Sequence, residues 1–222
     1  MNKLNHVAFI MDGNGRWGKR RGRGRNFGHL KGVETVKKVV KGSIKLNIPI
    51  ITFYVFSSEN WKRPKKEKNY LFALIHNYFS KELELIIKQG IRIKILGDIT
   101  KFSSNLRSLL KKTILLTRNN TKITVNLALN YGSNIEILQA IKKTKGRLTI
   151  KNFERNLYTG GMPNPDILIR TGGYKRLSNF LLWQIAYTEL FFVKKLWPDF
   201  KTNDLIKIIK EFKRIKRNYG KV

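Results

Sequence analysis

A short apolar run near the start of the chain ends on residues that could bind a charged ligand. The run Val7-Ala8-Phe9-Ile10-Met11 is followed directly by Asp12-Gly13-Asn14-Gly15-Arg16-Trp17. A buried strand delivers the residues after it to the rim of its sheet, where glycine lets backbone N–H groups approach phosphate oxygens. A carboxylate there can hold a hard cation such as Mg²⁺, whose shell phosphate oxygens complete. The segment therefore indicates a diphosphate site assisted by a divalent metal ion.

The same segment also matches the dinucleotide-binding fingerprint. Gly13-x-Gly15-x-x-Gly18 follows the apolar run, and Glu34 lies near the position of a ribose-binding carboxylate. That fingerprint needs a helix immediately after its third glycine, whereas residues 19–25 contain so much glycine and like charge that we expect no helix there. Asp12 would in addition repel a pyrophosphate that has no metal ion. We therefore favour the metal-assisted diphosphate site.

Polar segments also follow other apolar runs. They cover residues 57–64, 130–132 and 170–173, and each contains hydrogen-bond donors or cations. Ligands of parallel α/β sheets bind beyond the carboxyl ends of the strands, so we expect these segments to converge on one anion-binding rim.

Short apolar runs alternate with segments of helical periodicity along the whole chain. This pattern predicts an α/β fold, a single layered domain with a central, mostly parallel six-stranded sheet flanked by helices. The expected strands cover residues 6–11, 50–56, 91–96, 124–130, 166–170 and 188–193. The expected helices cover residues 33–45, 70–88, 104–118, 134–143, the region 178–186 and 203–216. No linker or repeat divides the 222 residues, so we expect one domain over residues 1–222.

The predicted helix over residues 70–88 is apolar on more than one face. It is either buried between the sheet and a neighbouring helix, or it forms one wall of an apolar tunnel. A tunnel beside a diphosphate rim would suit a prenyl chain.

The chain is strongly basic, with 46 Lys and Arg against 14 Asp and Glu and a net charge of +32. This charge attracts polyanions such as nucleic acid, anionic lipid or phosphorylated metabolites. The alternative explanation for the charge is a compositional bias over the whole chain, without a specific partner. Cysteine is absent, which excludes disulfides and thiolate chemistry. The apolar runs are too short or interrupted for a secretory signal or a membrane span. We expect a cytoplasmic protein that touches the inner membrane face at most peripherally.

Four separated segments together resemble one family, the cis-prenyltransferases, which includes the undecaprenyl diphosphate synthases. The segments cover residues 6–17, 56–64, 166–173 and 176–200, in family order. The resemblance implies Mg²⁺-dependent condensation of isopentenyl diphosphate onto an allylic diphosphate, with farnesyl diphosphate as the expected starter. Repeated condensation would give a cis-polyprenyl diphosphate. We expect undecaprenyl diphosphate, the precursor of the lipid carrier for cell-wall glycan synthesis.

The resemblance also implies roles for individual residues. Asp12 would be catalytic and bind the metal ion, and Glu189 would be a second metal carboxylate, which in the family can come from the neighbouring subunit of a homodimer. Asn60 occupies the position often assigned as proton acceptor, and because an amide is a poor base we expect it to orient the oxygen that takes the proton. The implied substrate-binding residues are Gly13, Asn14, Gly15, Arg16, Trp17, Arg25, His29, Ser57, Ser58, Glu59, Trp61, Arg63, Arg170, Arg176, Leu177 and Ser178.

Two departures from the family pattern stand out. Tyr174 and Lys175 occupy positions where many relatives have an acidic residue and a histidine, so no histidine metal contact is expected, and a protonated Lys175 would sooner meet phosphate. Residues 143–157 form a shorter stretch than in typical long-chain bacterial members, which leaves the product length open.

Two other functions compete with this one. A nucleic-acid-binding protein is suggested by the net charge and the Arg/Gly segment 20–25, but no nucleic-acid-binding motif accompanies them and we expect no such partner. A non-catalytic family subunit is the second alternative, and the presence of Asp12, Arg170 and Glu189 counts against it.

Overall fold

The computed structural model describes residues 2–218, which are built around one six-stranded sheet. The strand order is β3-β4-β2-β1-β5-β6, and every neighbouring pair is parallel. The expected α/β class and mostly parallel sheet are therefore confirmed, and all the predicted strands are present. Their bounds are β1 (His6–Ile10), β2 (Ile50–Ser57), β3 (Ile91–Leu96), β4 (Ile123–Tyr131), β5 (Ile167–Arg170) and β6 (Glu189–Phe192).

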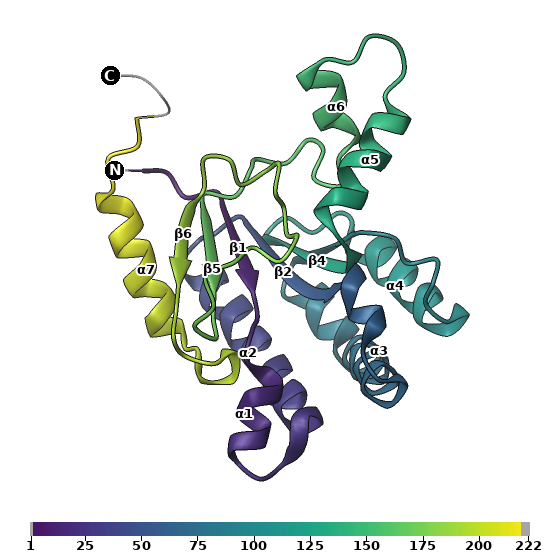
Figure 1. Ribbon diagram of the computed structural model, residues 1–222, viewed down its shortest axis with the longest axis vertical. Coiled ribbons are helices and arrows are strands. Elements are labelled where there is room, and N and C mark those ends of the chain that lie inside the picture. Colours follow the sequence, from purple (N-terminus) through teal and green to yellow (C-terminus); the bar gives the residue numbers. More distant parts are fainter. Residues whose placement is uncertain (1, 219–222) are drawn as a thin grey trace.

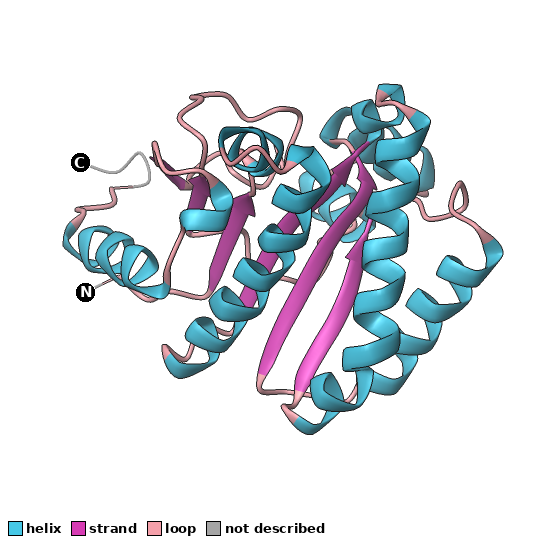
Figure 2. Cartoon of the chain, turned by 90° about the horizontal axis from the view of Figure 1, so that it is seen from below, coloured by secondary structure: helices cyan, strands magenta, loops and turns pink. Residues whose placement is uncertain are grey.

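Helices connect most of the parallel strands and cover the sheet, whereas the connection from β5 to β6 consists of turns. Figure 1 shows α7 beside β6 near one edge of the sheet and α3 and α4 near the other, and Figure 2 shows helices packed along the strands. The α-helices are α1 (Asn14–Arg20), α2 (Gly24–Lys45), α3 (Lys65–Lys88), α4 (Ser104–Thr117), α5 (Ser133–Lys143), α6 (Ile150–Asn156) and α7 (Thr202–Arg214). Two 3₁₀ helices are η1 (Ser58–Lys62) and η2 (Trp197–Asp199).

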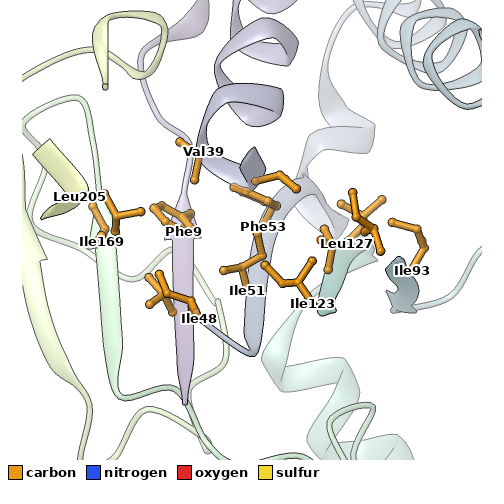
Figure 3. Close-up of a cluster of buried hydrophobic side chains, with 14 of the residues drawn as sticks. Phe9, Val39, Ile48, Ile51, Phe53, Ile93, Ile123, Leu127, Ile169 and Leu205 are labelled. Atoms are coloured by element: carbon orange, nitrogen blue, oxygen red, sulfur yellow. The ribbon is translucent and has the colours of Figure 1, made fainter. Parts of the chain in front are cut away.

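The main hydrophobic core lies between the central strands and the helices on one face (Figure 3). Phe9 of β1 and Phe53 of β2 pair in register, and their rings stack with centroids 5.1 Å apart. The indole of Trp197 packs edge-on against both rings. All of β1 is buried, which explains why it reads as a continuous apolar run. This packing fixes the central strand, and with it the position of Asp12 beyond its end.

A polar network crosses the same strands inside the sheet. His6 Nε2 lies 2.7 Å from Thr52 Oγ1, and His6 Nδ1 lies 2.8 Å from the carbonyl oxygen of Pro163. That carbonyl only accepts hydrogen bonds, so Nδ1 carries the proton and Nε2 accepts from the Thr52 hydroxyl. Asn126 donates to the same hydroxyl oxygen at 2.9 Å. Burial lowers the pKa of His6 from 6.5 to about 4, so the ring is neutral at pH 7.

Acidification is expected to destabilise the fold through His6. Because its folded pKa of about 4 lies below the ordinary 6.5, the unfolded chain binds more protons between these values. Stability therefore falls as the pH drops from 6.5 towards 4, by about 3 kcal/mol at the low end. Urea unfolding at pH 7 and pH 4 measures the loss. His6→Asn should lose clearly less unfolding free energy than the parent over this range, and equal losses would show that His6 is not the origin.

The prediction of a helix over residues 178–186 is wrong. The segment instead forms a series of turns, in which Ser178, Asn179 and Leu181 have φ values of +52°, +62° and +49°. Left-handed residues cannot continue a right-handed helix. The turns are held by tertiary hydrogen bonds, among them from the Ser133 N–H to the Asn179 carbonyl and from the Leu182 N–H to Ser133 Oγ. The apolar side chains Phe180 and Leu181 are buried by these turns rather than by a helix face.

The expectation that residues 19–25 contain no helix is also wrong in part. Helix α1 begins at Asn14, inside the glycine motif, and ends at Arg20, and α2 begins at Gly24 instead of residue 33. The two helices cross so closely that a Cβ on Gly28 would lie 1.8 Å from the Asn14 carbonyl oxygen. Tertiary packing thus stabilises helices whose sequences have low helix propensity. The short helices η1 and α6 were likewise not predicted from the sequence.

No helix within residues 2–218 is long and apolar enough to cross a membrane.

Candidate active site

The rim at the carboxyl ends of β1 and β5 holds Asp12 firmly through its backbone. The Asp12 carbonyl oxygen accepts hydrogen bonds from Thr171 Oγ1 at 2.8 Å and from the Trp197 N–H at 3.0 Å. These partners come from the segments that follow β5 and β6. The carboxylate itself stays 26% exposed, so a ligand can reach it.

The Asp12 carboxylate lies between two arginines. Its Oδ1 is 3.2 Å from Arg16 Nη2, and its Oδ2 is 2.9 Å from Arg170 Nη2. The Arg170 side chain is only 4% exposed, and it also donates to Ser178 Oγ at 2.8 Å and to the Arg176 carbonyl. Arg170 Nε is buried and has no hydrogen-bond partner within residues 2–218. The structure thus brings together five of the residues singled out in the sequence, from three separate segments.

Gly172 allows this close arrangement. Its φ is +88°, a backbone conformation that side chains disfavour, and a Cβ there would lie 2.5 Å from Arg16 Nη2 and 3.1 Å from Asp12 Cγ. The loop can therefore close over the carboxylate only because this residue has no side chain. It also places Tyr174 against the arginines, a contact that sequence reasoning missed. The only signal for it was the departure from the family pattern at this position.

A second charged cluster surrounds Glu67 on α3. Arg25 of α2 donates to both carboxylate oxygens, from Nε at 3.1 Å and from Nη2 at 3.0 Å. Arg63 Nη1 donates to Oε1 at 3.2 Å, and His29 Nε2 lies 3.4 Å from the same oxygen. Three predicted substrate-binding residues therefore meet around one carboxylate. Glu67 was missed from the sequence, although its spacing of four residues from Arg63 is that of a helical ion pair.

Burial and the neighbouring arginines determine the protonation states of His29 and Glu67 in this cluster. Burial and the nearby Arg63 lower the pKa of His29 to about 4, so its ring is neutral at pH 7. Its Nε2 is buried without a hydrogen-bond partner among the described residues. Burial acts to raise the pKa of Glu67, but its hydrogen bond and charge interaction with Arg25 and the charge of Arg63 outweigh this and lower it. Glu67 is therefore ionised, and it holds the arginines as an anion.

The segment after β2 is arranged around η1. The Ser57 N–H donates to Asn60 Oδ1 at 3.2 Å, so the Asn60 amide caps this short helix. Asn179 Nδ2 donates to Glu59 Oε1 at 2.9 Å, which links η1 to the turns after Ser178. Ser58 lies against Gly132, where a Cβ would come 2.5 Å from its hydroxyl oxygen.

Three other predicted site residues pack into the protein instead of joining the arginines. Trp61 packs on Phe56, Phe72 and Phe102, and its Nε1 donates to Asn130 Oδ1 at 2.7 Å. Trp17 Nε1 donates to Asp199 Oδ1 at 2.7 Å, which anchors α1 to η2. Leu177 packs against a small buried cluster that contains Phe180.

Glu189 lies at the other end of the sheet. It is the first residue of β6 and pairs with Ile167, whereas the rim is level with Arg170, which pairs with Ile10 and Phe192. Three strand positions separate them, or about 10 Å along the strand. The Glu189 carboxylate contacts Arg217 Nε at 3.4 Å. Within one chain the two predicted metal carboxylates therefore do not meet.

An apolar cavity of about 130 Å³ opens beside the two charged clusters. Met11, Asn14 and His29 line it near the rim, and it extends between α2, α3 and the sheet. Helix α3 contributes to the core through Phe79 and Ile86, and it lines the cavity with the same residues and several half-buried ones. The full lining is Met11, Asn14, His29, Gly32, Val33, Val36, Val40, Val55, Phe56, Leu71, Leu74, Ile75, Tyr78, Phe79, Ile86, Ile91, Ile93, Val125, Leu127, Leu129 and Trp197.

The donor set fits a metal ion that a phosphorylated ligand shares. Within residues 2–218 no group of three His, Asp or Glu side chains is placed to hold a metal. Mg²⁺, however, usually takes only one or two protein carboxylates and completes its shell with substrate phosphates and water. Asp12 supplies one such carboxylate, and the unpartnered Arg170 Nε and His29 Nε2 are groups that phosphate oxygens can satisfy.

Comparison with known proteins gives a consistent result along the whole chain. The family model described as "Putative undecaprenyl diphosphate synthase" matches residues 10–220. An isoprenyl transferase from Wolinella succinogenes is 45% identical over 223 residues, which are 99% of this chain and 98% of that protein. A ditrans,polycis-undecaprenyl-diphosphate synthase from Pasteurella multocida, named as (2E,6E)-farnesyl-diphosphate specific, is 44% identical over 97% of this chain and 94% of its own.

Solved structures share the fold. Lavandulyl diphosphate synthase from Lavandula x intermedia, in complex with dimethylallyl diphosphate, superposes with a TM-score of 0.93 at 30% identity, over 98% of both chains. A "probable undecaprenyl diphosphate synthase" from Campylobacter jejuni superposes with a TM-score of 0.86 at 34% identity, over 100% of both chains. The resemblance found in the sequence is thereby confirmed: this chain belongs to the undecaprenyl diphosphate synthase family of prenyltransferases.

Proposed function

We propose that this protein condenses isopentenyl diphosphate repeatedly onto an allylic diphosphate and so makes a cis-polyprenyl diphosphate. Farnesyl diphosphate is the proposed starter, in line with the relative from Pasteurella multocida. Undecaprenyl diphosphate, a lipid carrier precursor for cell-wall glycan synthesis, is the proposed product. The observation that supports this function best is the placing of the Asp12 carboxylate, between Arg16 and Arg170 and next to an apolar cavity.

The two charged clusters suit two diphosphates. We assign the allylic diphosphate to the rim residues Gly13–Arg16 together with Arg25 and His29. Arg25 and His29 both contact Glu67. The isopentenyl diphosphate is assigned to Arg170, Arg176 and Ser178. Arginine forks hold phosphate oxygens in a fixed geometry, so the two substrates would be oriented toward each other.

The reaction makes one carbon–carbon bond and breaks one carbon–oxygen bond. The double bond of isopentenyl diphosphate attacks the allylic carbon, the allylic diphosphate departs with the bonding electrons, and a proton lost from the five-carbon unit leaves a new cis double bond. Arg16 and Arg25 would stabilise the negative charge that develops on the departing group. Mg²⁺, held by Asp12 and the phosphates, would supply further charge neutralisation there.

Neither His29 nor Asn60 is a strong base for the proton that the five-carbon unit loses. His29 is neutral at pH 7 because of its lowered pKa, and Asn60 Oδ1 is engaged by the Ser57 N–H. Since an amide is in any case a weak base, we assign the proton to an oxygen of the departing diphosphate or to water, oriented by the rim. The apolar walls of the cavity would keep water from the electron-poor carbon.

The growing chain would occupy the apolar cavity. Its volume of about 130 Å³ is comparable to that of cavities that hold a single small hydrocarbon, so a long product requires α2 and α3 to separate. We therefore propose that the packing between these helices, through Val36, Leu71 and Ile75, influences product length.

A homodimer would complete the site. We propose that a second copy supplies Glu189 as the second metal carboxylate, because within one chain it lies at the other end of the sheet. Leu182, Trp183 and Leu190 are exposed apolar residues near it in sequence and would form part of the interface with α7. Sedimentation at micromolar concentration tests this, and a monomer would contradict it. We further propose a cytoplasmic location with peripheral contact between the basic surface and membrane lipid.

The proposed function predicts extractable polyprenyl product from purified protein. With Mg²⁺, farnesyl diphosphate and labelled isopentenyl diphosphate, label should pass into the organic phase, and the product should be resolved by carbon number. Chelation of the metal with EDTA should abolish the transfer. A protein that binds Mg²⁺ and both substrates yet transfers no label would contradict the proposal, and would favour a non-catalytic subunit.

A further inference from the structure

Tyr174 lies in the loop after β5, and its ring faces three arginine side chains. The ring centroid is 4.3 Å from Cζ of Arg176, 4.7 Å from that of Arg16 and 6.0 Å from that of Arg170. A guanidinium within about 6 Å of an aromatic centroid is attracted to the ring face. One uncharged side chain thus gathers cations from α1, from β5 and from its own loop.

The three arginines differ in what else holds them. Arg16 forms an ion pair with Asp12, and Arg170 is buried and bonded to both Asp12 and Ser178. Arg176 is exposed, and among the described residues its side chain has no ion pair and donates no hydrogen bond. Its guanidinium stacks on the ring of Tyr174. Removal of the ring would therefore release Arg176 far more than it would release the other two.

An aromatic ring is well suited to hold an arginine that must bind phosphate. The ring contacts the face of the guanidinium, whereas the N–H donors point outward in its plane and stay free. A carboxylate in the same place would occupy these donors and cancel the charge. An arginine held in advance also loses less rotamer entropy when a ligand binds.

We propose that Tyr174 is a positioning residue that fixes Arg176, beside Arg16 and Arg170, for the diphosphate of the five-carbon substrate. This inference rests on the proposed function of the site. The contact is already made without substrate, and we propose that it persists in the complex, so its loss should weaken binding more than turnover. The effect should therefore fall on the KM for isopentenyl diphosphate.

A graded series at this position tests the proposal. Tyr174→Leu should raise the KM for isopentenyl diphosphate about fivefold, the effect of losing a stack of this kind, with kcat within about twofold of the parent. Tyr174→Phe keeps the ring and should match the parent, and Tyr174→Trp should match or lower its KM. Calorimetric titration with inorganic pyrophosphate should rank the proteins in the same order. Melting temperatures should agree, because Tyr174 is exposed and belongs to none of the hydrophobic clusters formed by residues 2–218.

A matched control is Phe27→Leu. It removes another stack, in which Arg23 Cζ lies 4.3 Å from the Phe27 centroid, together with the packing of Phe27 on Trp17 away from Arg176. It should leave the KM for isopentenyl diphosphate unchanged. Parent values of KM and pyrophosphate affinity in Tyr174→Leu, or equal losses in the Phe and Leu variants, would overturn the proposal. If the parent itself transfers no label, the proposed function fails, and the pyrophosphate titration still decides whether Tyr174 positions an anion-binding arginine.

Discussion

Asp12→Asn is expected to lower the rate of prenyl transfer about 1,000-fold, the equivalent of about 4 kcal/mol of transition-state stabilisation. Within one chain the Asp12 carboxylate is the group that we assign to the metal ion, and an amide of the same shape carries no charge to hold it. The variant should stay folded, because the amide oxygen can still accept from Arg16 or Arg170. We expect a loss of about 1–2 kcal/mol in stability, or roughly 5 °C in Tm.

Asp98→Asn is the matched control for this change. Asp98 follows β3, and its carboxylate binds the N–H and hydroxyl of Thr100 at 2.8 and 2.9 Å, apart from the arginines of the rim. The same substitution there should leave turnover within about twofold of the parent. Single-turnover rates and isopentenyl diphosphate affinity should be measured for both variants. Turnover near the parent level in folded Asp12→Asn would remove Asp12 from the catalytic role.

Gly28→Ala is expected to damage both the fold and the activity. A Cβ at this helical position would meet the backbone of α1, at 1.8 Å from the carbonyl oxygen and 2.7 Å from the carbonyl carbon of Asn14. Backbone atoms cannot turn aside as the end of a side chain can, so α1 must shift. We expect a loss of about 3 kcal/mol in the free energy of unfolding. Displacement of Arg16 by about 1 Å should lower turnover about 100-fold.

Gly22→Ala is the control that separates the steric clash of a new Cβ from the loss of glycine's conformational freedom. Gly22 lies between the same two helices with a φ of +66°, and a Cβ there would meet nothing within 4 Å. The substitution should lower the free energy of unfolding by only about 1 kcal/mol, because alanine disfavours the left-handed backbone conformation. Turnover should not change. Alanine also favours helix over glycine by about 1 kcal/mol, so a gain in stability in Gly28→Ala would show that α1 is free to move. Urea unfolding and steady-state kinetics on both variants decide this.

The centre of the sheet was predictable because β1, β2, β4 and β5 are mostly buried. Such strands read as unbroken apolar runs, and β1 is the clearest of them. The turns over residues 178–186 were not predictable, since Phe180 and Leu181 have apolar periodicity but are buried by left-handed turns that the start of α5 holds in place. Helix α1 was missed for a similar reason, because its close contact with α2 outweighs its low propensity.

The part of the site that could be predicted is the part in which the strand order of the sheet alone brings the residues together. Asp12 and Arg170 follow neighbouring parallel strands, so the rule for strand ends brings them together. The contacts of Glu67 with Arg25 and of Tyr174 with Arg16 depend on how α3 and the loop after β5 pack, which no local pattern expresses. The position of Glu189 depends on register, because the same short strand carries one end of its sequence to the rim and the other end away from it.

The central position of β1 has a consequence for biosynthesis. This strand leaves the ribosome before the other strands of the sheet, yet β5, one of its two neighbours, begins only at Ile167, and the Asp12 carbonyl is held by Trp197. A nascent chain that has not yet reached these residues exposes one edge of a strand that is apolar from Val7 to Ile10, which is the kind of surface that aggregates. The candidate active site thus begins with the first strand of the sheet to be translated and is completed only after the last one.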